Sequence, residues 1–231
     1  MKATHRHTTH GHEHEFEAAR GLPEALPADE KLLWQGSPDW RALARRAFHL
    51  RKLALYFAVL VLLRAAFVFD DTGSTATALR ATFGPLALAA VALGLIGLMA
   101  WLSARSTVYT LTDKRVVMRI GIVLTLTFNI PYKRIAAAGL HLDTGGRGDL
   151  PLALLPPDRI ALLHLWPHAR PWRVSRPEPM LRCVPDAAEV ARLLAQAWSQ
   201  ATGLAPEPRA AAAPRPEASA HGSNQPALAG H

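Results

Sequence analysis

The chain has little cysteine and little acidic charge. Its one cysteine, Cys183, cannot form an internal disulfide or a Cys-rich zinc site, and it suits a reducing compartment. Aspartate and glutamate number 18 against 26 lysines and arginines, which leaves a net charge of +8. Nucleic-acid binding would require a basic face interleaved with aromatic residues, whereas here many arginines flank apolar runs. We therefore expect no nucleic-acid partner.

Charge is missing altogether from residues 81–104, which Arg80 and Arg105 bracket. A helix rises about 1.5 Å per residue, so this run can cross a hydrocarbon core of about 30 Å, and we predict a transmembrane helix. Residues 53–69 form a second apolar run close to the minimum length for a span. With residues 70–80 as the connecting loop, the two runs predict a transmembrane hairpin.

Arg64 interrupts the first apolar run. It either reaches the far membrane surface beside Asp70 and Asp71 or faces a polar partner inside the membrane. The sequence leaves both interpretations open, and Arg64 is a candidate partner-binding residue.

Basic residues flank the predicted hairpin on its outer ends. Residues 30–52 predict a short strand and a basic amphipathic helix that lies on anionic headgroups. The candidate membrane-surface residues are Arg45, Arg46, Arg51, Lys52 and Arg105. The positive-inside rule places both termini in the cytoplasm and residues 70–80 in the periplasm of a bacterial inner membrane, cytoplasmic or intracytoplasmic. Glycines at positions 84, 94 and 97 allow close helix approach and leave a homodimer open.

The two ends of the chain predict disorder. Residues 1–29 have no apolar core, so we expect no cleavable signal peptide. They hold a cluster of histidines: His5, His7, His10, His12 and His14. These could share a divalent metal, but acidic or cysteine ligands at a fixed spacing are missing, and we expect a solvated tail without a functional metal site. Residues 204–231, rich in alanine and proline, predict a second disordered tail.

Between residues 105 and 203 the hydrophobic period changes from helical to alternating. Residues 124–130 place Leu124, Leu126, Phe128 and Ile130 on one face of a half-buried strand, and Leu150, Leu152 and Leu154 alternate again. Residues 185–203 then predict a helix with one apolar stripe, ended by a glycine. We expect an α+β protein: a cytoplasmic antiparallel β domain closed by a C-terminal helix.

The segment His164–Trp172, HLWPHARPW, holds two tryptophans, two prolines and two histidines. Prolines prevent a regular ladder, so we expect a rigid exposed loop. Exposed tryptophan and arginine are frequent anchors of binding patches. The candidate partner-binding residues here are Trp166, His168, Arg170 and Trp172. The alternative is a loop that packs its tryptophans onto the sheet or into the membrane surface.

Catalytic patterns are scarce. We find no nucleophile elbow, metal motif or pair of carboxylates at a catalytic spacing. His141 and Asp143 lie two residues apart and fit a solvated strand edge. We expect a protein that is not an enzyme and that carries no cofactor.

Two further stretches carry a family resemblance. The run YTLTDKRVVMRIG, residues 109–121, directly after a transmembrane hairpin, resembles the bacterial membrane-anchored form of the pleckstrin-homology-like (PH-like) domain. In that group an acidic residue and a Leu-Trp-x-Gly-x-Pro stretch precede the hairpin. This chain matches them with Glu30, Leu33, Trp34, Gly36 and Pro38.

Within that group, residues 21–52 and 159–196 resemble the PuhB family, photosynthetic complex assembly factors of purple bacteria. The resemblance implies a non-enzymatic assembly factor for the reaction centre and its light-harvesting complex. It implies contacts with reaction-centre and light-harvesting subunits or other assembly factors, besides the lipid bilayer. The alternative is a membrane-anchored PH-like scaffold that binds lipid or protein and has no link to photosynthesis.

Overall fold

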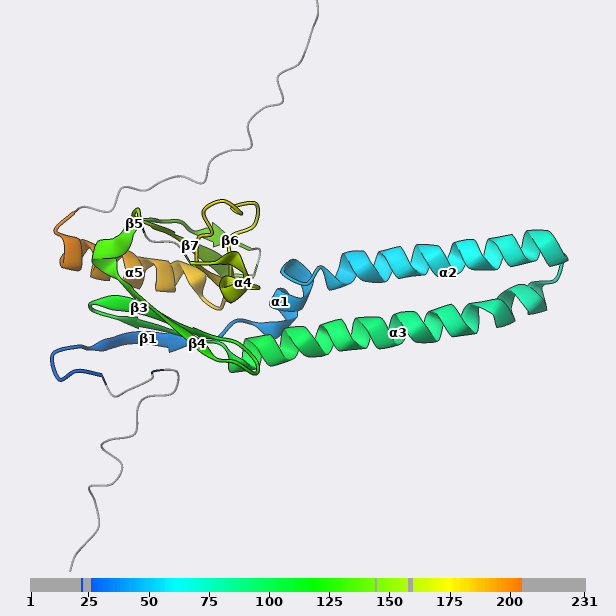
Figure 1. Cartoon of the computed structure of the whole chain (residues 1–231), viewed down its shortest axis with the longest axis horizontal. Coiled ribbons are helices and arrows are strands. Elements are labelled where there is room, and N and C mark those ends of the chain that lie inside the picture. The colour runs from blue at the N-terminus through cyan, green and yellow to red at the C-terminus, as the bar shows by residue number, and fades with distance from the viewer. Residues whose placement is uncertain (1–21, 23–25, 144, 158–159, 205–231) are drawn as a thin grey trace, which may run out of the picture.

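The computed structural model describes residues 22, 26–143, 145–157 and 160–204 of the 231-residue chain. A domain of β-strands and one long helix lies at one end, and two longer helices project from it as a hairpin (Figure 1). Nearly all of the two predicted tails lies outside the described residues. The five clustered histidines, His5, His7, His10, His12 and His14, lie outside them as well.

The projecting helices are α2 (Leu50–Thr72) and α3 (Thr75–Ser106). Both are longer than the apolar runs that predicted them, and the predicted loop 70–80 shrinks to Gly73 and Ser74. Gly73 ends α2 in a left-handed conformation (φ 64°), which glycine adopts without strain. The Ser74 side chain accepts a hydrogen bond from an amide of the first turn of α3.

Small residues are the buried ones along much of α3. Three of the buried residues of α3, Ala78, Ala89 and Ala100, are spaced eleven residues, or about three turns, apart. A Cβ atom added at Gly84, Gly94 or Gly97 would meet nothing within 4 Å. These glycines therefore do not mediate the contact between α2 and α3.

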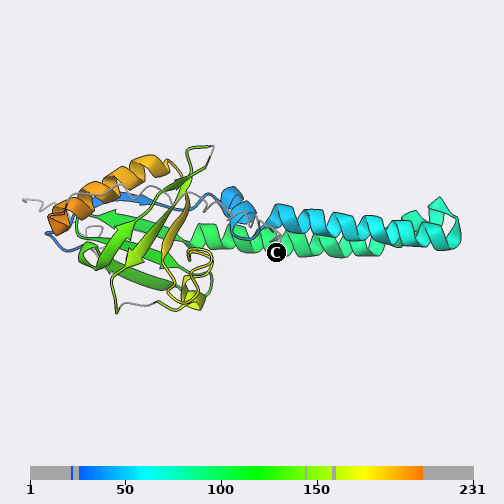
Figure 2. The same ribbon diagram turned by 90° about the horizontal axis from the view of Figure 1, so that it is seen from above.

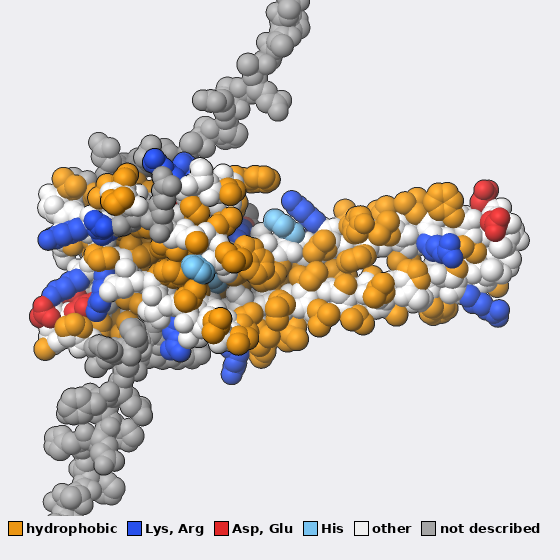
Figure 3. Space-filling view, in the orientation of Figure 1, with side chains coloured by type: hydrophobic (Ala, Val, Ile, Leu, Met, Phe, Trp, Pro, Cys, Tyr) orange, Lys and Arg blue, Asp and Glu red, His pale blue; other side chains and the backbone are white. Residues whose placement is uncertain are grey.

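Most of the apolar surface of the hairpin is exposed. None of the residues of α2, which the structure describes in full, is buried, and leucine, valine and phenylalanine side chains cover both helices (Figure 3). Each helix is long and apolar enough to cross a membrane. A core helix of a soluble protein would instead be covered on at least one broad face.

The domain consists of two antiparallel sheets. The first has the order β1 (Leu32–Gly36), β2 (Val108–Thr112), β3 (Arg115–Ile120) and β4 (Leu126–Pro131). The short helix α1 (Trp40–Arg46) and the hairpin are inserted between β1 and β2, which pair with each other. The strands before and after the hairpin thus belong to one sheet.

The second sheet follows the single-turn helix η1 (Tyr132–Arg134). Its strands are β5 (Ile135–Ala138), β6 (His141–Leu142), β7 (Gly148–Leu154) and β8 (Met180–Val184), with β7 pairing to the other three. A one-turn helix α4 (Leu162–Leu165) lies before β8, and α5 (Ala187–Thr202) follows it. Figure 2 shows α5 lying along the domain, away from the hairpin.

The core lies between the two sheets and α5. Leu150 and Leu152 are fully buried in it, and Val190, Leu194 and Ala197 of α5 pack against them as the apolar stripe predicted. The predicted α+β architecture, with antiparallel strands and a closing C-terminal helix, is confirmed. One predicted strand face is wrong at its start: β4 begins at Leu126, and Leu124 belongs to an exposed turn.

Glu30, Trp34 and Gly36, which precede the hairpin, each have a structural role. The Glu30 carboxylate, almost fully buried, accepts two hydrogen bonds from the Arg115 guanidinium at 2.8 Å each. This bidentate pair anchors the start of β1 to β3. The Trp34 ring packs against the core and lies directly over Gly36, where a Cβ would be 2.3 Å from the ring. The glycine two residues after the tryptophan therefore leaves room for the Trp34 ring to lie over the backbone of β1.

Replacing Gly36 with alanine should lower the free energy of unfolding by about 1–3 kcal/mol, because the added methyl pushes the Trp34 ring out of its packed position. Chemical denaturation of the detergent-solubilised protein, followed by circular dichroism, measures the change. Gly84→Ala is the control, because its methyl meets nothing and it should be neutral or stabilising. Equal stability of Gly36→Ala and the wild type would contradict this packing.

Candidate partner-binding surface

The exposed loop predicted at His164–Trp172 begins in α4, at the end of the domain that faces the long helices (Figure 1). Leu165 is fully buried and fixes the helix to the domain. Trp166 is 59% exposed, and its ring meets the Phe48 ring edge-on at 5.2 Å, between α1 and α2. One face of Trp166 thus packs on the base of the hairpin while the rest is available to solvent.

His168 is enclosed by the protein, which corrects the expectation that it lies exposed on the loop. Its side chain is fully buried. The ring lies between Thr107, at the end of α3, and Tyr109 of β2: Nε2 is 3.1 Å from the Thr107 hydroxyl and Nδ1 is 2.6 Å from the Tyr109 hydroxyl. Burial with two polar partners makes His168 a structural link between the loop and the base of the hairpin.

The neighbouring hydrogen bonds assign the tautomer of His168. The Thr107 hydroxyl donates to the Ser103 carbonyl at 2.7 Å, so it must accept from Nε2–H. The Tyr109 hydroxyl accepts from the Arg182 amide at 3.1 Å, so its own proton is free for Nδ1. A neutral ring satisfies every group. Burial, and secondarily the charge of Arg182, lower the His168 pKa to about 3, in agreement with a neutral ring.

Beyond His168 the chain forms an exposed loop that closes on itself. Ala169 and Pro179 form a β-bridge at its base, and Arg170 Nη1 contacts Glu178 Oε2 at 2.7 Å. Trp172 lies at φ 64° and is 98% exposed. An exposed tryptophan on a loop with a fixed base is a feature of binding surfaces. Trp166, Arg170 and Trp172 therefore remain the candidate surface, as predicted.

Arg64 does not belong to this surface. It lies on α2, about 21 Å along the helix from Leu50. Its side chain is exposed, and within the described part of the chain it makes no ion pair. Arg64 thus remains a candidate partner-binding residue that is separate from the loop.

The basic residues expected at a membrane surface divide into two groups. Arg51 and Lys52 are exposed in the first turn of α2, and Arg105, in the last turn of α3, stacks over the Trp101 ring at 5.5 Å. All three lie where the hairpin meets the domain. Arg45, on α1, is exposed as well.

Arg46 corrects the prediction, because its side chain is turned into the protein. Its Nη2 atom lies 3.1 Å from Oδ2 of Asp149, a buried carboxylate of β7. The other oxygen of Asp149 accepts the Cys183 amide of β8 at 2.8 Å. This one carboxylate therefore ties α1 to two strands of the second sheet. Burial raises the pKa of the Cys183 thiol to about 12, so it is protonated at neutral pH.

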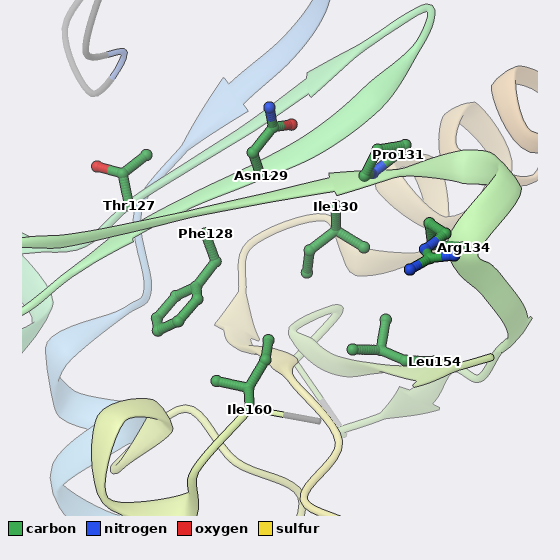
Figure 4. A pocket seen from close by; sticks show the side chains of 8 residues that line it. All are labelled: Thr127, Phe128, Asn129, Ile130, Pro131, Arg134, Leu154 and Ile160. Atoms are coloured by element: carbon green, nitrogen blue, oxygen red, sulfur yellow. The ribbon is translucent and has the colours of Figure 1, made fainter. Parts of the chain in front are cut away.

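A pocket of about 440 Å³ opens between β4 and the segment that follows β7. Phe128 and Ile130 point from β4 toward Leu154 and Ile160 (Figure 4). Among the described residues that line it, Arg134 is the one charged side chain, and none is an acid or a histidine. Residues 22, 26–143, 145–157 and 160–204 also hold no group of three potential metal ligands. The described lining of the pocket thus combines apolar side chains with polar ones.

Comparison with known proteins identifies the class. The bacterial PH domain family matches residues 52–198, and the chain belongs to that family. The match begins inside α2 and ends inside α5, so it includes both long helices. A protein of Rhodobacter capsulatus described as an uncharacterized 23.7 kDa protein in the puhA 5′ region is 38% identical over 205 residues, which cover 88% of this chain and 94% of the relative. No solved structure matches the chain.

Two apolar features were missed by sequence reasoning. Leu163, on α4, is exposed, and so is Val123, which follows Gly121 in the turn between β3 and β4. The signal for the turn was present: three apolar residues in a row directly after a glycine, where a turn is ordinarily polar. Their exposure depends on the β3–β4 pairing, which only the structure shows.

Proposed function

We propose that this protein is a membrane-anchored assembly factor for the photosynthetic reaction centre and light-harvesting complex, and that it acts by protein contacts rather than as an enzyme. The observation that carries the proposal is the 38% identical relative, which is described by its position in the 5′ region of puhA, a photosynthesis gene region. The resemblance of residues 21–52 and 159–196 to the PuhB assembly factors supports it.

Membrane anchoring is supported by the surface of the hairpin. Two helices of sufficient length expose leucine, valine and phenylalanine over most of their circumference, which in water would be an aggregation hazard. The basic side chains of Arg51, Lys52 and Arg105 lie at the domain end of the hairpin, whereas Asp70 and Asp71 lie at its tip with one arginine, Arg80, less than two turns along α3. This asymmetry supports an inner-membrane protein with the domain and both termini in the cytoplasm.

The mechanism follows from this arrangement. The lipid-facing sides of α2 and α3 offer apolar surface on which a transmembrane helix of an incoming subunit can pack. The loop that carries Trp166, Arg170 and Trp172 contacts a cytoplasmic segment of that subunit or another assembly factor. Because His168 ties the loop to the end of α3, both contacts are made by one rigid unit.

A second candidate is a PH-like scaffold that binds lipid or protein without a role in photosynthesis. Membership of the bacterial PH domain family supports it, since that match names no photosynthetic partner. Affinity purification of the tagged protein from photosynthetic membranes separates the two. Recovery of pigment–protein subunits favours assembly, and recovery of lipid alone favours the scaffold.

Deletion of the gene in its host tests the proposal, with near-infrared absorption spectra of the membranes as the measurement. We expect loss of the reaction-centre and antenna bands, and restoration by the wild-type gene.

The double variant Trp166→Ala and Trp172→Ala should reach the membrane at wild-type level yet restore the bands only in part, because the contact residues are gone. Trp40→Ala, an exposed tryptophan on α1, is the matched control. Normal spectra after deletion would overturn the assembly role, and full restoration by the double variant would remove the loop from it.

A further inference from the structure

The turn between β3 and β4 presents three apolar side chains in a row to solvent. Val123 is 90% and Leu124 82% exposed, and Ile122 is exposed as well. Turns of this kind are ordinarily polar, and single exposed apolar residues are common, but a run of three at a hairpin tip is not. The tip has the composition of a surface that is covered in the working protein.

The backbone holds these side chains outward. Gly121 begins the turn at φ 115°, and a Cβ there would lie 2.0 Å from the Leu124 carbonyl oxygen. Only glycine permits so close an approach. Below the turn, Ile120 pairs with Leu126 in the antiparallel ladder. The tip is therefore a tightly closed turn and not a loose loop whose apolar residues could fold back onto the sheet.

Strand register places the tip beside the end of α3. Val108, two residues after α3 ends, pairs with Arg119 of β3. From Arg119 β3 continues toward the hairpin to Ile120, and the closed turn lies beyond it. The turn therefore lies at the level of the end of α3. The views in Figures 1 and 2 agree that this end of β3 and β4 faces the base of the two long helices.

Other groups suited to a membrane surface lie at the same end of the domain. In the last turns of α3, Trp101 is exposed and stacks with Arg105, a pair typical of the headgroup region. On α4, at the same end of the domain, Leu163 is 85% exposed and Trp166 is more than half exposed. An apolar tip, an aromatic–cation pair and an apolar helix turn thus share the end from which the spanning helices leave.

We propose that the Ile122–Val123–Leu124 tip inserts into the headgroup and upper acyl region of the bilayer that the hairpin spans, with Leu163 as a second shallow contact. This inference rests on the proposed membrane anchoring and adds a lipid-contacting site to it. Lipid is the occupant because the tip adjoins the spanning helices and Arg105 supplies a cation for anionic headgroups. Three contacts with the membrane fix the tilt of the domain and the height at which the Trp172 loop meets a partner.

Site-specific fluorescence on the full-length protein in lipid nanodiscs tests the proposal. A polarity-sensitive dye is attached to Val123→Cys, to Leu88→Cys in the exposed middle of α3, and to Lys133→Cys on η1 at the far end of the domain. The native Cys183 is buried with a raised pKa and should not be labelled. Two sets of lipids, brominated either in the upper part of the acyl chain or near its end, then quench dyes that lie at the matching depth.

We expect a blue-shifted emission and strong quenching at positions 88 and 123, and neither effect at position 133. Quenching at 88 with none at 123 would overturn the tip insertion and leave the anchored hairpin intact. Absence of quenching at 88 would overturn the membrane anchoring itself, and the insertion with it. Quenching at all three positions would show that the domain lies flat in the membrane, which also contradicts insertion by the tip.

Discussion

Replacing His168 with alanine is expected to lower the free energy of unfolding by about 3–5 kcal/mol, because it opens a cavity and strands buried polar groups. The ring is fully buried, and both of its nitrogens are hydrogen-bonded, to Thr107 and Tyr109. Chemical denaturation in detergent measures the loss. His164→Ala, an exposed histidine on α4, is the matched control and should change stability little. A loss at His168 no larger than at His164 would contradict the network.

The same histidine predicts an acid dependence of stability. Its pKa is about 3 in the folded protein and near the ordinary 6.5 in the unfolded chain. Between these values the unfolded chain binds a proton that the folded protein does not, so the free energy of unfolding falls as the pH drops. The stability that the neutral His168 ring contributes is fully present above about pH 6.5. Below this pH it is lost by up to about 1.4 kcal/mol per pH unit.

His168→Gln separates this titration from packing, since glutamine keeps hydrogen-bonding groups and carries no titrating proton. The stability difference between wild type and His168→Gln should shrink between about pH 7 and about pH 5. A difference that stays constant over this range would show that His168 titrates normally in the folded protein.

Replacing Asp149 with alanine should destabilise the protein by about 3–5 kcal/mol, because it leaves the Arg46 guanidinium partly buried without its anion and the Cys183 amide without its acceptor. Asp149→Asn retains an acceptor for the amide and should lose less. Thermal and chemical denaturation of the detergent-solubilised variants measures both effects.

Two adjacent arginines provide the matched control for this ion pair. Arg46→Ala should be clearly destabilising, whereas Arg45→Ala, one position earlier and exposed, should be close to neutral. If the two substitutions cost the same, the contact between α1 and β7 contributes nothing to stability.

The features that sequence predicted well are those set by local pattern. The stripe of Val190, Leu194 and Ala197 identifies α5, and alternation identifies β7, because periodicity reports directly which face is buried. The ends of the long helices were missed for a related reason. Residues 70–80 are polar and look like a loop, yet helical geometry continues until Gly73 and Ser74 provide the two caps.

The polar contacts inside the domain could not be predicted in this way. His168 meets a residue 61 positions earlier, and the Cys183 amide meets a carboxylate 34 positions earlier. In the sequence His168 stands among prolines, tryptophans and arginines, residue types that are typical of an exposed loop, so its neighbours suggested an exposed position. Only the return of the chain to the end of α3 encloses it.

The insertion of the hairpin inside a sheet has a consequence for how the chain is made. β1 is synthesised before either long helix, and its partner β2 emerges directly after both. If the helices span the membrane, the two strands meet only when the chain has crossed the bilayer an even number of times. A chain that retained one crossing would leave β1 and β2 on opposite sides, with the core of the domain unformed. Closure of the first sheet thus requires that both long helices insert, and a chain with a single crossing cannot complete the domain.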